Sequence, residues 1–297
     1  MGVALDPPLD RHRPASTAPV STNPPTPPTG LPSVLPGHFD PRFARVFAWW
    51  VQRMLRHDFY AVRLATEHAG LLRDLASHPG PVLGVSNHSS WWDPLVFVLL
   101  QRRFMWGRGT IGPVEAAQWR RFGFMRKLGL FGIDPADPRA APALVDHVMA
   151  ELRRAPRTNF WITPQGQFVD PRDPIRIRPG VSMVAAAAQQ AGLDPRAVSI
   201  AIEYVFWVDR RPELLIRLAP VPAPPEPAPR SSTSAWHRSF VRAMRANQDA
   251  LADLARARDP APFTILLGGS GGRVNPAYDL WQRLRGRSGA IEARRLT

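Results

Sequence analysis

The sequence predicts an α/β protein in which a mixed, largely parallel β-sheet is flanked by helices. Two observations support this prediction. Between residues 81 and 220, short apolar runs typical of strands alternate with segments of helical periodicity, as they do in β–α–β proteins. The chain has 297 residues, 44% of them hydrophobic, which is enough for one sizeable core. We therefore expect a single folded domain over residues 38–297.

The first 37 residues differ in composition from the rest of the chain. They contain ten prolines with serine and threonine, and almost no large apolar residues. Such a segment has too little apolar surface to offset the entropy lost on ordering. We expect residues 1–37 to be a disordered, proline-rich arm.

Helical periodicity begins directly after the arm, so residues 38–57 are expected to form an amphipathic helix. Phe43, Phe47, Trp50 and Met54 belong to its apolar stripe, and arginines lie beside the stripe. A face of this kind either packs on its own domain or lies in the interface of a bilayer. The sequence leaves both alternatives open.

The remaining elements follow from the same periodicities. Strands are expected at residues 81–86, 104–106, 130–133, 159–163, 197–207 and 214–220, and helices at residues 93–100, 118–128, 140–154, 180–191 and 235–257. A proline cluster at residues 220–229 separates the sheet from a C-terminal helical extension, residues 230–297. In sheets of this type ligands bind beyond the carboxyl ends of the strands, so we look for chemistry there.

Composition restricts the function classes. The formal net charge is +14, which favours anionic partners such as phospholipid headgroups, nucleic acid or phosphorylated cofactors. The arginines are scattered over every predicted helix and no nucleic-acid motif is present, so we do not expect a nucleic acid partner. There is no cysteine, which excludes disulfides and thiol catalysis, and the histidines lack metal-ligand spacing. No apolar stretch is long enough for a spanning helix.

One pair of residues stands where the chemistry is expected. His88 and Asp93 follow the first predicted strand and enter the helix after it. A carboxylate that binds one imidazole nitrogen fixes the tautomer, leaves the other nitrogen free as a base, and stabilises the imidazolium. Because no protein nucleophile accompanies the pair, it suits a substrate that brings its own hydroxyl.

These residues also carry a resemblance to a known family. Asn87, His88 and Asp93 match the Asn-His-x4-Asp block of the glycerol-phosphate and lysophospholipid acyltransferases (the PlsC type). Three looser blocks follow in the family's order: residues 129–134, residues 162–167, and a glycine-led helix at 180–191 followed by an apolar strand at 198–202. The resemblance covers roughly residues 40–220 and implies a glycerol-3-phosphate acyltransferase-like fold.

The resemblance also implies roles for individual residues. It makes His88 the general base and Asp93 the residue that orients it. The residues that it places at the substrate are Asn87, Gly129, Phe131, Asp134, Pro164, Gln165 and Gly166. The turn at Pro164–Gly166 is expected to help hold the oxyanion of the reaction.

The sequence departs from the family's pattern at three points. Pro135 stands where an arginine is usual, Gln165 replaces a glutamate, and the arginine expected just after Gly166 is absent. An amide hydrogen-bonds a hydroxyl but carries no charge to organise an arginine. We expect three nearby arginines to replace the missing one in binding phosphate or coenzyme A: Arg172, Arg176 and Arg178.

The function implied is O-acyl transfer from acyl-CoA or acyl carrier protein to a lipid hydroxyl, without a metal or other cofactor. The expected acceptor is a lysophospholipid such as 1-acylglycerol-3-phosphate. A glycolipid or carotenoid glycoside, and a non-catalytic membrane-bound homologue, remain as alternatives because Gln165 weakens the phosphate-holding set. Both substrates are reached from the membrane surface, so the expected location is cytoplasmic, peripheral to the inner face of the cell membrane.

Overall fold

The computed structural model describes residues 33–207, 209–225 and 232–268, all within one compact unit. In these residues the strands form a nine-stranded sheet in the order β1-β5-β4-β6-β3-β7-β8-β2-β9. The strand bounds are β1 Val34–Leu35, β2 Ala61–Ala65, β3 Val82–Ser86, β4 Gly109–Glu115, β5 Leu130–Ile133, β6 Thr158–Ile162, β7 Arg196–Val205, β8 Glu213–Val221 and β9 Phe263–Gly268.

The middle of the sheet is parallel and its margins are mixed. Strands β5, β4, β6, β3 and β7 pair in parallel, whereas β8 runs antiparallel to β7. Strand β2 is parallel to β8, and the edge strands β1 and β9 pair antiparallel with β5 and β2. The predicted fold class, a mixed and largely parallel sheet flanked by helices, is confirmed.

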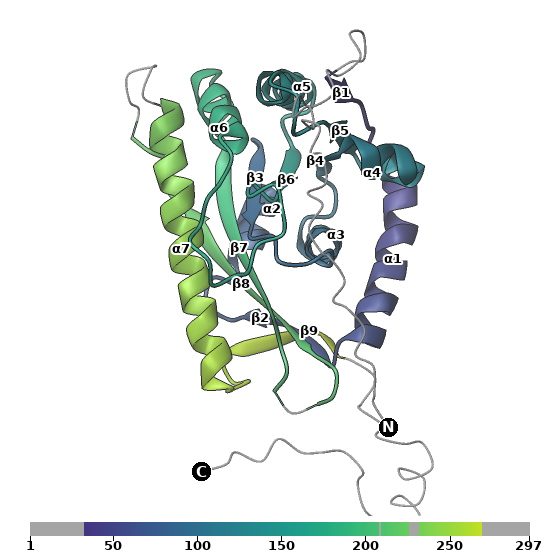
Figure 1. Ribbon diagram of the computed structural model, residues 1–297, viewed down its shortest axis with the longest axis vertical. Helices are drawn as coiled ribbons and strands as arrows, with labels where there is room; N and C mark the ends of the chain where they lie inside the picture. The colour runs from purple at the N-terminus through teal and green to yellow at the C-terminus, as the bar shows by residue number, and fades with distance from the viewer. Residues whose placement is uncertain (1–32, 208, 226–231, 269–297) are drawn as a thin grey trace, which may run out of the picture. The chain divides into compact units, whose positions relative to one another are not determined.

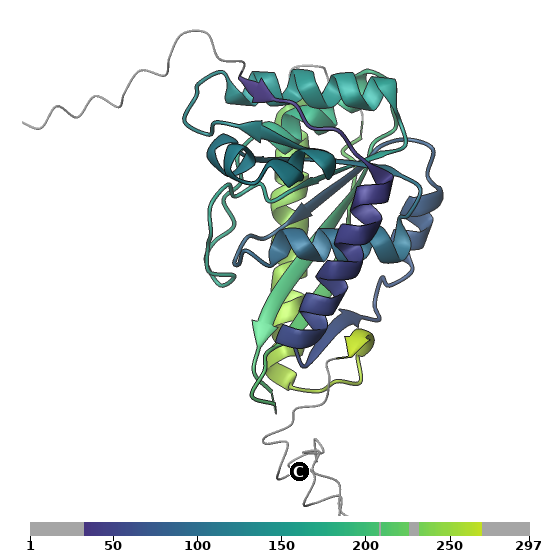
Figure 2. The same cartoon turned by 90° about the vertical axis from the view of Figure 1, so that its right-hand side faces the viewer.

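Helices cover both faces of the sheet (Figures 1 and 2). Helices α1 (Pro41–Asp58), α2 (Leu71–Ser77) and α3 (Asp93–Phe104) pack on one face. Helices α5 (Ala140–Arg154), α6 (Gly180–Gln190) and α7 (Ser232–Ala257) pack on the other. The short helices α4 (Ala116–Arg121) and η1 (Gly123–Lys127) connect β4 to β5.

The central strands supply apolar side chains to both cores. In β3, Val82 joins the core under α1–α3, whereas Leu83 and Val85 join the core under α5–α7. Such a strand is apolar on both faces, which is why it reads as a continuous apolar run. Gly84 leaves room for a neighbour, because a Cβ at this position would lie 2.1 Å from the ring of Trp161 on β6.

Most predicted elements are present, and two need correction. The strand expected at residues 104–106 is wrong, because α3 continues to Phe104 and the strand is β4, beginning at Gly109. The helix expected at residues 118–128 is two short pieces, α4 and η1. Strand β4 contains two glycines and Pro113, so its sequence resembles a turn.

The ends of the domain carry elements that the sequence did not predict. Residues 1–32 of the expected arm lie outside the described residues, but its last part contains β1. Within the expected C-terminal helical extension, α7 is followed by β9, which adds a strand next to β2. Residues 269–297 of that extension lie outside the described residues. The boundaries at 37 and 230 stay predictions.

Helix α1 divides its apolar residues between two environments. Asp40 caps the helix by accepting hydrogen bonds from the backbone N–H groups of Arg42 and Phe43. Val51 and Leu55 are fully buried against the sheet. Val46, Trp49 and Trp50 instead project outward, exposed by 67%, 66% and 46%. None of the helices in the described part of the chain is long and apolar enough to cross a membrane.

Candidate active site

The candidate site lies at the carboxyl end of β3, in the middle of the sheet. Asn87 directly follows the strand and is almost completely buried. Its side chain donates to the carbonyl of Ile202 and accepts from the N–H of Ile202, both at 2.9 Å, so it extends the pairing of β3 with β7. Its second N–H points to Ser89 Oγ at 3.4 Å. These bonds use both amide donors, so Asn87 fixes the loop that carries His88. Its contact with substrate stays a prediction.

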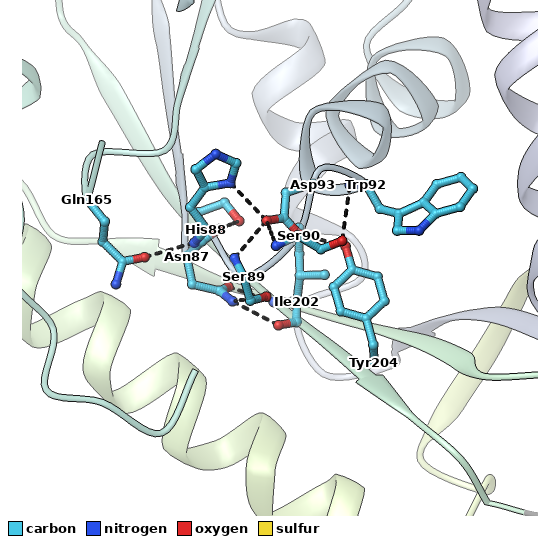
Figure 3. A network of polar contacts seen from close by, with 10 residues as sticks. Asn87, His88, Ser89, Ser90, Trp92, Asp93, Gln165, Ile202 and Tyr204 are labelled. Atoms are coloured by element: carbon cyan, nitrogen blue, oxygen red, sulfur yellow. Dashed lines mark hydrogen bonds and ion pairs between the residues drawn. The ribbon is translucent and has the colours of Figure 1, made fainter. Parts of the chain in front are cut away.

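His88 and Asp93 meet as the sequence predicted. Nδ1 of His88 lies 3.0 Å from Oδ2 of Asp93 (Figure 3). The carboxylate can only accept, so Nδ1 carries the proton and Nε2 of the neutral ring is an acceptor. Among the residues that the structure describes, Nε2 has no hydrogen-bond partner. The side chain of His88 is 17% exposed and that of Asp93 is 0% exposed, so only the imidazole is open to a ligand.

The carboxylate of Asp93 is fully bonded although it is buried. Oδ2 also accepts the backbone N–H groups of Ser89 and Ser90, at 2.8 and 2.9 Å. Oδ1 accepts the hydroxyl of Tyr204 at 2.6 Å, and Figure 3 shows the carboxylate between this hydroxyl and His88. Asp93 is also the first residue of α3, where the helix dipole favours negative charge. These contacts offset the desolvation of the carboxylate.

Tyr204 reaches the site from β7 and was missed by the sequence analysis. Burial, together with the negative charge and the hydrogen bond of Asp93, raises the pKa of its phenol well above the usual range. The hydroxyl therefore stays protonated and donates to Asp93 at all ordinary pH values. A tyrosine in an apolar strand, 111 residues from its partner, carries no local signal of this role.

The β6–α6 loop (residues 163–179) lies against the histidine. Oε1 of Gln165 accepts the backbone N–H of His88 at 2.8 Å, and the N–H of Val169 donates to the carbonyl of His88 at 2.8 Å. Phe168, also missed from sequence, places its ring 4.5 Å from the imidazole, centroid to centroid. This loop therefore fixes the backbone of His88 on both sides.

The turn at Pro164–Gly166 has a different role from the one expected. The N–H of Gly166 donates to the carbonyl of Thr163 at 3.1 Å and closes the turn, so it is not free for an oxyanion. Gly166 has a φ of +68°, which favours glycine. The carbonyl of Pro164 accepts the N–H of Arg178 at 2.8 Å. Pro164, Gln165 and Gly166 thus lie beside His88, and their measured contacts hold the loop.

The second block is not at the histidine. Strand β5 is separated from β3 by β4 and β6. Phe131 is fully buried in the core under α5–α7, and Gly129 enters β5 at a φ of +79°, where a Cβ would lie 1.9 Å from the carbonyl oxygen of Thr110. In the structure Phe131 is part of the core and Gly129 permits close strand packing, and their contact with substrate stays a prediction. Asp134 is exposed after β5 and caps the turn by accepting the N–H of Ala136.

The three predicted arginines occupy separate positions on the β6–α6 loop. Arg172 is exposed and pairs with Asp170 at 3.3 Å. Arg178 packs on Gly166 and donates to the carbonyl of Pro135 at 3.3 Å, next to Asp134. Arg176 lines a pocket against α7. Arg178 is therefore the arginine closest in structure to the turn beside His88.

Exposed aromatic side chains surround this edge of the sheet. Trp91 in the loop after His88, Phe168 in the β6–α6 loop and Phe206 after β7 are exposed by 57%, 61% and 64%. Exposed aromatic residues of this kind are typical of surfaces that bind apolar ligands. Within the described residues, no group of three His, Asp or Glu side chains is arranged to hold a metal ion.

An α/β sheet with a carboxylate-held histidine at the carboxyl end of a central strand can place a general base beside a bound ligand. Residues 72–203, from α2 into β7, match the sequence model of the family described as Acyltransferase. This match identifies residues 72–203 as an acyltransferase domain of the PlsC type, which supports a lipid acyltransferase in general. No curated protein matches the chain significantly.

Proposed function

We propose that the protein transfers a fatty acyl group from acyl-CoA or acyl carrier protein to the hydroxyl of a lysophospholipid such as 1-acylglycerol-3-phosphate. The single observation that supports this most directly is the pair His88–Asp93, with the imidazole open on its Nε2 side and the carboxylate buried. The family match supports acyl transfer, and the aromatic surroundings support a lipid substrate.

In the proposed reaction, Nε2 of His88 takes the proton of the acceptor hydroxyl as its oxygen attacks the thioester carbonyl carbon. The tetrahedral intermediate then collapses, the carbon–sulfur bond breaks, and the leaving thiolate takes the proton from the imidazolium. Asp93 stays ionised and stabilises that imidazolium. General base action of this kind contributes about 10²–10⁴ in rate.

Two features support a lipid acceptor that carries a phosphate. Phe168, whose ring lies against the imidazole, and Trp91, three residues after His88, offer exposed apolar surface. Arg178 places a guanidinium beside Gly166, one residue from Gln165, which contacts His88. A guanidinium binds phosphate through paired N–H donors. We propose that Arg178 holds the acceptor phosphate.

We further propose that the protein works at the inner face of the cell membrane, docked through α1. The outward side chains of Val46, Trp49 and Trp50 continue into Phe122 and Phe124 of the α4–η1 segment, because Phe47 and Phe124 lie 5.5 Å apart, centroid to centroid. We name these five exposed residues the aromatic face. Exposed arginines on α1 flank it, as in helices that lie at anionic interfaces.

The reaction is tested by incubating the purified protein with a panel of lipid hydroxyls and labelled palmitoyl-CoA, and identifying products by mass. We expect acylated lysophosphatidate from the wild type and none from His88→Ala. His57→Ala removes an exposed histidine from α1 and should retain activity. Turnover in the His88→Ala variant, or no product from any acceptor in the wild type, would refute the proposal.

Docking is tested by flotation with vesicles that contain anionic phospholipid. Trp49→Ser/Trp50→Ser changes only outward side chains, whereas removing residues 38–57 would also remove the buried Val51 and Leu55. We expect the double variant to lose most of its flotation. Ile265→Ser alters another exposed apolar side chain, 53% exposed on edge strand β9, and should float as the wild type does. Equal flotation of all three proteins would contradict the proposal that α1 docks the protein to the membrane.

A further inference from the structure

A pocket of about 510 Å³ lies between the β6–α6 loop and α7. Figure 1 shows this loop passing alongside α7 on its way to α6. The pocket, called the basic pocket below, is lined by Ile175, Arg176, Ile177, His237, Arg238, Val241 and Arg242. Its volume lies within the range of about 300–1,000 Å³ that is typical of small-ligand sites.

The charge of the basic pocket is of one sign. Arg176 comes from the loop, and Arg238 and Arg242 come from one face of α7, one turn apart. None of the three forms an ion pair within the described part of the chain, and no carboxylate is among the lining residues there. Three arginines that line one pocket without a counter-charge create a positive potential that attracts an anion.

Two other arginines of α7 form ion pairs. Arg245 pairs with Asp249 at 3.0 Å, and Arg256 pairs with Asp253, each within one turn of the same helix. The unpaired arginines of α7 in the described part of the chain are therefore the two that line the basic pocket. Their arrangement is explained by a ligand that brings the missing negative charge.

The lining also has an apolar part. Ile175, Ile177 and Val241 are partly buried side chains between the charged groups. A site that combines guanidinium groups with aliphatic walls suits a ligand with several phosphates on a planar, weakly polar ring system. A nucleotide has this combination, whereas a lone inorganic phosphate would leave the aliphatic walls in contact with water.

The basic pocket is joined to the candidate active site through the backbone of one loop. Val169 bonds to the carbonyl of His88, and Ile175 is six residues further on, which is at most about 22 Å of extended chain. At the other end, Arg178 follows Ile177 directly and bonds to the carbonyl of Pro164, next to Gln165. A ligand held in the pocket by its phosphates can reach His88 with a long flexible arm.

We propose that the basic pocket binds the nucleotide end of acyl-CoA, with Arg238 and Arg242 on its phosphate groups and the pantetheine arm leading to His88. This inference rests on the proposed function and names its donor. A carrier protein would need a broad surface for its acidic helix, whereas this site is a recess whose volume fits a nucleotide. The protein therefore recognises the donor through its coenzyme A part and not through a carrier protein.

The test compares two donors that carry the same acyl group, palmitoyl-CoA and palmitoyl-pantetheine, which lacks the nucleotide. We expect Arg238→Gln/Arg242→Gln to raise the KM for palmitoyl-CoA by about tenfold or more, because charge-assisted bonds to phosphate are lost. The kcat with either donor and the KM for palmitoyl-pantetheine should not change. Glutamine keeps the helix propensity of these exposed positions.

Arg73→Gln/Arg103→Gln is the matched control, since it removes the same charge from exposed positions of α2 and α3 on the other face of the sheet. It should leave the KM for palmitoyl-CoA unchanged. An equal rise in the control would attribute the effect to overall charge and overturn the proposal. So would a rise in the KM for palmitoyl carrier protein alone, or an unchanged KM for palmitoyl-CoA in the pocket variant.

Direct binding separates this inference from the proposed function. Calorimetric titration with coenzyme A should show binding to the wild type and to His88→Ala, and about tenfold or greater loss in Arg238→Gln/Arg242→Gln. If this binding pattern is found but no lipid is acylated, coenzyme A binding in the basic pocket is supported and the proposed reaction is refuted. If acyl transfer is found but coenzyme A binds both proteins equally, the pocket assignment fails alone.

Discussion

Tyr204 donates its hydroxyl proton to Oδ1 of Asp93 at 2.6 Å, from a strand that the sequence places 111 residues away. The other carboxylate oxygen faces Nδ1 of His88 and two backbone N–H groups. Asp93 is thus held from both sides, and the orientation of His88 depends on a residue just beyond the segment that matches the family model. Tyr204 acts through Asp93 and is a positioning residue.

Removing this hydroxyl should loosen the pair without removing it. For Tyr204→Phe we expect kcat to fall about tenfold with little change in KM, and the free energy of unfolding to fall by about 1.5–3 kcal/mol, as for other hydrogen bonds to charged groups. Proton NMR gives a direct readout, because the His88 Nδ1–H bonded to Asp93 should resonate far downfield and broaden in the variant. An unchanged Nδ1–H signal together with an unchanged kcat would show that the hydroxyl serves stability alone.

Gln165 supports the backbone of His88, so the identity of its acceptor atom matters more than its charge. Gln165→Leu leaves the His88 N–H without its partner at 2.8 Å, and we expect kcat to fall about tenfold. Gln165→Glu retains an acceptor oxygen and should keep most of the activity. Steady-state kinetics on both variants distinguish these outcomes, and equal losses in the two would mean that the hydrogen bond is not what matters.

The same glutamate variant tests the choice of acceptor. A rise in lysophosphatidate acylation relative to glycolipid acylation would support the idea that glutamine weakens phosphate binding. An unchanged ratio of the two activities would count against it.

The architecture was predictable from sequence where the hydrophobic periodicity and the flanking turn residues indicate the same element. Helix α5 and strand β5 have the predicted bounds, because an amphipathic stripe and a short apolar run are both unambiguous there. Strand β4 was missed because Gly109, Gly112 and Pro113 resemble a turn, although strand packing requires Gly112: a Cβ there would lie 2.7 Å from the carbonyl of Trp161. Tertiary packing overrides the local preference at this strand.

The site was predictable only in its local part. His88 and Asp93 are five residues apart and their loop geometry brings them together. A single sequence motif was therefore enough to predict their contact. Tyr204 and Phe168 arrive from distant segments, and their contacts with Asp93 and His88 depend on strand order and loop path. The motif alone did not reveal that Phe131 of the second block is packed in the core, because burial depends on the strand order.

Gly84 should tolerate no side chain. Its substitution by alanine would place a Cβ 2.1 Å from two ring carbons of Trp161, so the indole or the strand must move. We expect Gly84→Ala to lower the free energy of unfolding by about 1–3 kcal/mol or more, as overpacking of a core does. Urea unfolding measures this change.

Gly70→Ala is the control for that substitution. Gly70 has an ordinary φ of −71° and nothing within 4 Å of the added Cβ. Its stability should be unchanged or rise by about 0.4–1 kcal/mol. If Gly84→Ala were as stable as Gly70→Ala, the close packing of β3 on Trp161 would be refuted.

His147 should make stability depend on pH. Its ring packs on Phe131 with centroids 4.5 Å apart, and burial lowers its pKa below the usual value of 6.5, an effect that the charge of Glu151 partly opposes. Above the unfolded pKa both states hold a neutral ring. As the pH falls through that value, the unfolded chain binds the proton more readily, and the folded state loses stability. His147→Gln should therefore lose less stability than the wild type between pH 7.5 and pH 5.5, measured by urea unfolding at each pH. The comparison at pH 7.5 isolates the packing change of the substitution, and parallel losses in the two proteins would show that the ring is not desolvated.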